Sequence, residues 1–319
     1  MQASGENGYL NGYQKVFFIR KNSKRPNYNL YVKLMHKKIN RAFAVDRPSL
    51  QIIPFVFSSP HSGANYPDSF ITKSKLDLLT LRQSEDSFVD DLYAEAPNYG
   101  APLIRALFPR AYLDANREAY ELDQTMFTEP LPNYVNTNSA RVSSGLGTIP
   151  RIVSTGSEIN RDKLSFEEAT HRINSYYFPY HAALKELIEE TKLKFGKCIL
   201  IDCHSMPSIG NAINNKNNEQ VDIVLGDKHG KTCASELMQF VESFLINLGF
   251  IVRRNHPYAG GYTTKHYGNP DNDVHTLQIE INRANYMNEK TMTRKRNFLT
   301  IKNKLSKLLL ALADAKFNF

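Results

Sequence analysis

The chain has 319 residues, 41% of them hydrophobic, so it is long enough to bury a core without disulfide or metal staples. No segment approaches the roughly 18 consecutive apolar residues of a membrane span, and the N-terminus lacks the pattern of a secretory signal peptide. We therefore expect a cytoplasmic protein with no membrane partner.

The net charge of +8 is concentrated in the first 45 residues, where nine basic residues face the single acid Glu6. A nucleic-acid enzyme usually spreads its basic residues along the groove that holds its substrate. We therefore expect no nucleic-acid partner. Residues 1–45 are interpreted as a basic leader, flexible or weakly helical, ahead of one catalytic domain over 46–319.

From about residue 50, predicted strands alternate with helices. A β-branched and aromatic run predicts a strand over 51–59, which ends in a tight Pro-His-Ser-Gly loop. Helical patterns fill roughly 74–97, and short strands are predicted at 102–107 and 110–114. Residues 124–163 lack periodicity, and a loop that long is usually functional, such as a lid, or else disordered.

The second half begins with a capping box, in which Ser165 is followed three residues later by Glu168. It starts a helical region that runs to about Phe195 and that Pro179 is expected to kink or divide. The later elements are strands at 197–203, 221–226, 250–254 and 276–281 and helices at 231–248 and about 289–316. Strands separated by helices predict an α/β domain with a mixed, largely parallel sheet.

The three cysteines do not predict a disulfide framework. Cys198 and Cys203 lie at an odd spacing on one predicted strand, so their side chains point to opposite faces and cannot pair. Cys203 is also adjacent to His204, and the same alternation excludes a thiol–imidazole dyad. The segment 226–232 has three residues between its glycines where a phosphate-binding loop has four, so we interpret it as a turn before a helix.

Polar residues cluster at the predicted strand ends, where ligands of α/β folds collect: His61, Asp114, Asn116, Arg117, His204 and Glu280. Two imidazoles and a carboxylate bind zinc while leaving a position for water, which is the catalytic arrangement. The sequence has no HExxH motif and no CxxC pair, so such a site would be assembled from distant segments. Each residue taken singly is equally consistent with a structural role.

Six short segments, in this order, resemble N-formylglutamate amidohydrolases: SPHSG (59–63), Asp86 through VDDLY (89–93), DANR (114–117), DCHS (202–205), GGYTTKHYG (260–268) and LQIEIN (277–282). The resemblance covers about 50–290 and leaves the leader outside. The family is related to zinc carboxypeptidases and aspartoacylase-like deacylases. It implies a zinc-exopeptidase-like fold, in which helices flank a central mixed, largely parallel sheet in a single α/β domain.

The resemblance implies one zinc ion held by His61 and His204. Related deacylases take a ligand Glu three positions after the first His, but that position here is Ala64. The formylglutamate hydrolase pattern offers Asp86 instead, with Glu85 as the weaker candidate. Asp86 is also a plausible N-cap of the helix that follows it.

Glu280 is implied as the general base, which takes a proton from the zinc-bound water and later gives it to the departing amine. In the alternating run 277–281 it lies on the face opposite the apolar residues. The alternative is a structural strand carboxylate paired with Arg283.

Asn116 and Arg117 resemble the substrate-carboxylate clamp of the related enzymes, because the planar guanidinium makes two parallel hydrogen bonds. Arg105 is a candidate second cation for the oxyanion or another carboxylate, and is equally consistent with a surface arginine. Asp114 and Asp202 each lie two residues before a proposed site residue, which suits them to orient that residue.

His266 lies with Tyr262 in the glycine-rich segment 260–268. A mobile loop there would close over the substrate and polarise its carbonyl. A merely flexible loop explains the pattern equally well.

The combined expectation is zinc-dependent hydrolysis of N-formyl-L-glutamate, or of a similar small-molecule N-acyl acidic amino acid. One alternative is a zinc amidase or carboxypeptidase that acts on a peptide. Another is a non-catalytic binding protein on the same fold, with the basic leader as its docking element.

Overall fold

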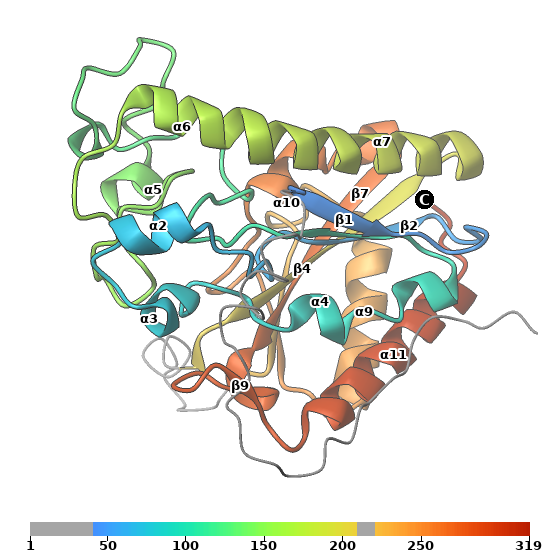
Figure 1. Ribbon diagram of the computed structural model, residues 1–319. Helices are drawn as coiled ribbons and strands as arrows, with labels where there is room; N and C mark the ends of the chain where they lie inside the picture. The colour runs from blue at the N-terminus through green and yellow to red at the C-terminus, as the bar shows by residue number, and fades with distance from the viewer. Residues whose placement is uncertain (1–40, 209–220) are drawn as a thin grey trace, which may run out of the picture. The chain divides into compact units, whose positions relative to one another are not determined.

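The computed structural model describes residues 41–208 and 221–319 (Figure 1). The leader up to residue 40 lies outside these residues, and Arg41–Phe319 forms one compact unit. None of the described helices combines the length and apolar character needed to cross a bilayer.

A mixed sheet of seven strands, in the order β1-β3-β2-β4-β7-β5-β6, forms the centre of this unit. The strands are β1 (Phe43–Asp46), β2 (Phe55–Ser59), β3 (Leu103–Ala106), β4 (Cys198–Met206), β5 (Ile223–Gly226), β6 (Val252–Arg254) and β7 (Val274–Asn282). The pairs β2–β3, β2–β4, β4–β7 and β5–β6 are parallel, whereas β1–β3 and β5–β7 are antiparallel. The predicted largely parallel α/β sheet is therefore confirmed.

Helices cover both faces of the sheet, which is why its central strands are buried throughout (Figure 1). Helix α7 (Phe178–Phe195) packs on the face that carries Val56 and Leu200, and α6 (Phe166–Arg172), which precedes it, contributes Ala169 to a separate apolar cluster. The other face, which carries Phe57, packs against α9 (Ser235–Asn247), α11 (Phe298–Asp314) and α4 (Val89–Leu92). The other α-helices of the described residues are α2 (Asp68–Lys73), α3 (Leu78–Arg82), α5 (Ala140–Ser143) and α10 (Tyr262–Tyr267).

Short 3₁₀ turns and one hairpin complete the described elements. The turns are Ala96–Tyr99, Gln124–Met126, Pro270–Asn272 and Arg283–Asn285, and the hairpin joins β8 (Met287–Asn288) to β9 (Thr293–Arg294).

Several local predictions are confirmed. The Ser165 hydroxyl accepts a hydrogen bond from the Glu168 backbone N–H at 3.1 Å and caps α6. A π-helical turn over Ile173–Tyr177 separates α6 from α7, and Pro179 lies at the start of α7. Proline has no N–H to donate, so the division falls where the regular hydrogen-bond ladder is interrupted. All three cysteines are free and buried.

Other local predictions were wrong. Residues 110–114 form turns rather than a strand, and the predicted helix over 74–97 is broken into α3, α4 and a 3₁₀ turn, with Phe88 at a φ of 69° between them. The C-terminal helix begins at Phe298, after the β8–β9 hairpin, rather than near 289. The segment 260–268 contains helix α10 rather than a loop.

The boundary between leader and domain also differs from the prediction. Phe43–Asp46 forms edge strand β1, which pairs antiparallel with β3. Phe43 and Val45 pack against the apolar core on the α7 side, so the end of the predicted leader belongs to the sheet. Four residues are too short a run for periodicity to reveal this pairing.

Candidate metal and catalytic site

The site lies near the carboxyl ends of neighbouring parallel strands. His61 follows β2, His204 lies near the end of β4, and Glu280 is its register partner on β7. Adjacent parallel strands bring their carboxyl ends to the same edge, so residues far apart in the sequence converge there.

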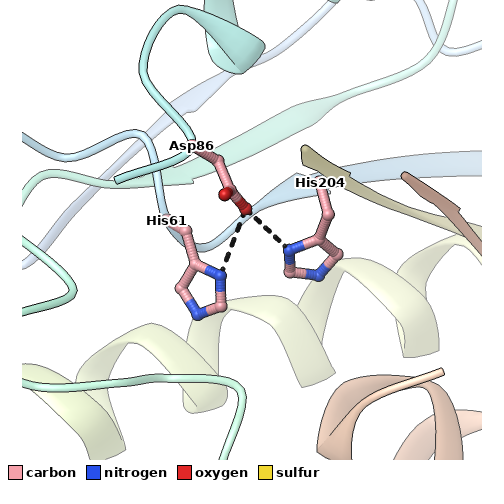
Figure 2. Close-up of side chains that lie close together, drawn as sticks. All are labelled: His61, Asp86 and His204. Atoms are coloured by element: carbon pink, nitrogen blue, oxygen red, sulfur yellow. Dashed lines mark hydrogen bonds and ion pairs between the residues drawn. The ribbon is translucent and has the colours of Figure 1, made fainter. Parts of the chain in front are cut away.

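His61, Asp86 and His204 form a buried cluster whose ligand atoms lie within 4.8 Å of one another (Figure 2). The Asp86 Oδ2 atom lies 3.3 Å from His61 Nδ1 and 3.0 Å from His204 Nδ1. The two imidazole ring centroids are 4.9 Å apart. Figure 2 shows both Nδ1 atoms turned toward the same carboxylate oxygen.

The outer nitrogens of the two rings face other carboxylates. His61 Nε2 lies 2.7 Å from Asp114 Oδ1, and His204 Nε2 lies 3.0 Å from Asp202 Oδ2. An Nε2–H that donates to a carboxylate leaves the Nδ1 lone pair free to bind a cation. Asp114 is thus placed to orient the His61 ring, whereas His204 Nε2 also faces the Asn116 amide, and Asp202 Oδ2 has no hydrogen-bond partner among the described residues.

The donor set fits a metal ion. His61 Nδ1 is buried and has no hydrogen-bond partner among the described residues. When His61 Nε2–H donates to Asp114, the His61 Nδ1 lone pair points at the Asp86 carboxylate oxygen, an arrangement that a cation between them would stabilise.

Asp86 rather than Glu85 reaches the cluster. Its Oδ1 atom accepts hydrogen bonds from Arg283 Nη2 at 3.0 Å and from Ser205 Oγ at 3.1 Å, which leaves Oδ2 toward the histidines. The Glu85 carboxylate instead accepts from Tyr66, Arg82 and Ser87. The N-cap alternative for Asp86 is excluded, because Phe88 occupies that position of α4 and no side chain caps the helix.

Glu280 is a buried carboxylate that lines the same cavity. Burial raises its pKa to about 7, and the negative charge of Asp86 adds to this, although His204 opposes it. Its Oε1 atom accepts a hydrogen bond from Gln278 Nε2 at 2.9 Å. The Arg283 guanidinium bonds Asp86, Ser205 and the Gln83 carbonyl instead, so the predicted alternative pairing with Glu280 does not form.

The cavity in front of this cluster has a volume of about 280 Å³. Four arginines line it, Arg110, Arg117, Arg141 and Arg283. Its charge pattern suits an anionic ligand that approaches the His61–Asp86–His204 cluster.

Asn116 and Arg117 lie where the sequence predicted a substrate clamp. The Asn116 Oδ1 atom accepts from the Thr263 backbone N–H at 2.7 Å, so its Nδ2 group faces His204 Nε2 at 3.1 Å. Arg117 is buried, and it donates to the Leu146 carbonyl at 2.8 Å and to the Asn116 carbonyl at 2.7 Å. Both residues line the cavity.

Arg110 is a site residue that sequence reasoning missed. Its Nε donates to Asp114 Oδ2 at 2.9 Å, and its charge acts on both Asp86 and Glu280. Burial alone would raise the pKa of Asp114, but Arg117 and Arg110 hold it well below its usual range. The nearby DANR segment (114–117) could have indicated that Arg110 belongs to the site. The strand wrongly predicted over 110–114 hid this connection.

Three predicted site residues do not line this cavity. Arg105 is paired with Asp46 at 2.9 Å and lies near Asp90, beside a separate cavity of about 390 Å³. Tyr262 and His266 lie on α10 and stack on each other with ring centroids 4.8 Å apart, and His266 is exposed. Residues four apart lie on the same face of a helix, so Tyr262 and His266 stack because the segment is helical.

Comparisons with known proteins agree with this geometry. The family model of N-formylglutamate amidohydrolase matches residues 53–287. An N-formylglutamate deformylase from Pseudomonas putida is 25% identical over 241 residues, which cover 74% of this chain and 83% of the relative. A second N-formylglutamate deformylase, from Pseudomonas aeruginosa, is 25% identical over 240 residues, again 74% of this chain and 83% of the relative.

Two solved structures share the fold. The crystal structure of an N-formylglutamate amidohydrolase from Ralstonia eutropha is 36% identical with a TM-score of 0.81, and the match covers 86% of this chain and 97% of that one. A gene product from Agrobacterium tumefaciens is 19% identical with a TM-score of 0.61, covers 85% of this chain and 93% of its own, and shows the fold alone. Because the family model spans most of the chain, the protein belongs to the N-formylglutamate amidohydrolase family and is a hydrolase that acts on an amide.

Proposed function

We propose that this chain uses one zinc ion, held by His61, Asp86 and His204, to hydrolyse the amide of N-formyl-L-glutamate or a similar N-acyl acidic amino acid. The observation that carries the proposal is the convergence of two imidazole Nδ1 atoms on one carboxylate oxygen beside an arginine-lined cavity. Two nitrogens and one oxygen are a usual zinc set, and they leave a position for exchangeable ligands.

When bound, zinc supplies Lewis acidity to the attacking water and the formyl carbonyl. Glu280 takes a proton from the water as the water oxygen bonds to the formyl carbon. The C–N bond then breaks, and Glu280 returns the proton to the departing amine nitrogen, so the products are formate and the amino acid. A carboxylate with a pKa near 7 suits both transfers at neutral pH.

The chain's cationic residues bind the substrate in this proposal. Arg117 and Asn116 hold the α-carboxylate. Arg110, whose charge acts on Glu280 and Asp86, stabilises the negative charge that develops on the carbonyl oxygen.

The cavity volume favours a small substrate. At about 280 Å³ it lies just below the range of small-molecule pockets, which is about 300–1,000 Å³. The assay below also distinguishes two alternatives, a peptide amidase or carboxypeptidase and a protein that binds without turnover.

The test combines metal analysis with activity. The purified chain should contain about one zinc per molecule, lose N-formylglutamate hydrolysis on chelation and recover it with zinc. Short peptides at matched zinc should be hydrolysed far more slowly. An enzyme that contains no metal and is indifferent to chelation would contradict the zinc assignment, while faster peptide cleavage would replace the substrate.

A further inference from the structure

We propose that Arg141 binds the side-chain carboxylate of the substrate and thereby selects acidic over neutral N-acyl amino acids. This inference rests on the proposed function and deepens it, because it assigns the residue that sets substrate class.

Arg141 is the one cavity-lining arginine whose guanidinium makes no hydrogen bond or ion pair with any described residue. Arg110 is bound to Asp114, and Arg283 is bound to Asp86 and Ser205. Arg117 spends two of its nitrogens on backbone carbonyls. Only Arg141 therefore keeps its whole planar fork free for a carboxylate from solution.

Two of the charges near Arg141 are repulsive, and the nearby Glu121 carboxylate is already bonded by the Ser139 hydroxyl. Arg141 acts on Arg117, whose pKa is lowered to about 10 by burial, with Arg110 and Arg141 adding to the effect. It also acts on Lys228, which is half-buried and further repelled by Lys265. A bound anion would relieve this repulsion, so this end of the cavity is complementary to a carboxylate.

The segment that carries Arg141 is held in place before any ligand arrives. Ser139 caps α5 by accepting a hydrogen bond from the Val142 N–H at 3.0 Å, and its hydroxyl donates to the Glu121 carboxylate. The Thr148 N–H also donates to the Glu121 carbonyl at 2.8 Å. These contacts tie α5 to the stretch just after Arg117, which reduces the entropy lost when the cavity binds a ligand.

The packing around Gly147 leaves little freedom in this segment. A Cβ atom at Gly147 would lie 2.3 Å from the Glu121 carbonyl oxygen. The chain therefore passes too close to Glu121 for a side chain, and the distance between Arg117 and α5 is set by backbone contacts. In the proposed complex one carboxylate of the substrate lies at Arg117 and the other at Arg141, which line the same cavity.

The experiment compares N-formyl-L-glutamate with N-formyl-L-glutamine, which has nearly the same shape but no side-chain charge. Full-length, zinc-loaded wild type should prefer the glutamate substrate in kcat/KM. Arg141→Gln should reduce that preference about 10- to 100-fold, mainly through KM, since a charge-assisted hydrogen bond is lost. Arg141→Lys should restore part of it.

Lys163→Ala serves as the matched control, because it removes one exposed positive charge from the same long segment but lines a different cavity. It should leave the preference unchanged. The inference is overturned if Arg141→Gln keeps the wild-type preference, or if it weakens both substrates equally while circular dichroism shows a native fold.

A binding measurement separates this inference from the proposed function. Calorimetric titration of N-formyl-L-glutamate into each variant reports recognition without turnover. If wild type binds N-formyl-L-glutamate and Arg141→Gln does not, the inference is supported. This holds even if neither substrate is hydrolysed, although the absence of hydrolysis would contradict the proposed activity. Equal binding by both proteins would sink the inference alone.

Discussion

At the residue scale, the two oxygens of Asp86 have different partners. Oδ1 accepts from Arg283 and Ser205, while Oδ2 faces the imidazoles. This division fixes the carboxylate's rotation, so the atom offered to a cation does not depend on the cation being present. Glu85, one position earlier, is committed to Tyr66 and Arg82.

We therefore expect Asp86→Asn and Glu85→Gln to differ sharply. Both changes preserve shape and remove one negative charge, but only the first removes a ligand charge from the cluster. Asp86→Asn should lower zinc affinity at least 100-fold, whereas Glu85→Gln should stay within about threefold of wild type. Competition with a chromophoric chelator measures both values, and a larger loss in Glu85→Gln would reverse the ligand assignment.

The environment of Glu280 predicts how kcat/KM depends on pH. Its raised pKa means that it is protonated on the acid side, so the base form and kcat/KM should increase as pH rises through about 7. A bound cation nearby favours the carboxylate, so the midpoint in the zinc enzyme should lie at or below that value.

The matched variant is Glu280→Gln. It should reduce kcat at least 1,000-fold while zinc content and circular dichroism remain those of wild type. Retention of near-normal turnover, or an acid limb that survives unchanged in the residual activity, would exclude Glu280 as the base.

At the element scale, α10 is packed directly against the site. Gly261 precedes its first turn, and a Cβ atom there would lie 2.3 Å from Asn116 Nδ2. The backbone N–H of Thr263, the second residue of the helix, donates to Asn116 Oδ1. The glycine is thus required for close approach, and α10 holds Asn116 by direct contact.

Gly261→Ala should therefore displace Asn116 and destabilise the protein by about 1–3 kcal/mol, with a raised KM. In an Asn116→Ala background the clash is absent, so the same glycine substitution should cost much less. Urea unfolding and steady-state kinetics of the four proteins form a double-mutant cycle, and strictly additive effects would contradict this coupling.

At the scale of the whole molecule, the cluster joins segments that are far apart in the chain. His61 follows β2, Asp86 lies between α3 and α4, and His204 is on β4. A cation that binds all three stabilises only the folded state, because the unfolded chain does not present the set together.

Zinc should accordingly raise the melting temperature. At a free concentration of 100 times the dissociation constant, the stabilisation is about 2.7 kcal/mol, which corresponds to several degrees for a chain of this size. Differential scanning calorimetry with increasing zinc checks this, with magnesium as the control ion. A melting temperature independent of zinc would contradict a site that spans these segments.

Local patterns along the chain were sufficient to predict the sheet class, the buried strands and the Ser165 cap. They also predicted the face of β7 that carries Glu280, because strand alternation depends on neighbours in the sequence. His61 and His204 were placed at strand ends for the same reason.

Only the tertiary structure decided which charged groups meet. The sequence analysis proposed Arg105 and not Arg110 as a cation of the site, yet Arg105 pairs with Asp46 across β1 and β3 while Arg110 reaches Asp114 in the cavity. The same holds for Asp86 against Glu85, and for Arg141, whose role depends on the absence of a partner among the described residues. Secondary structure is governed by interactions between near neighbours, whereas a charge's environment depends on strand register and packing between segments that the sequence separates by many residues.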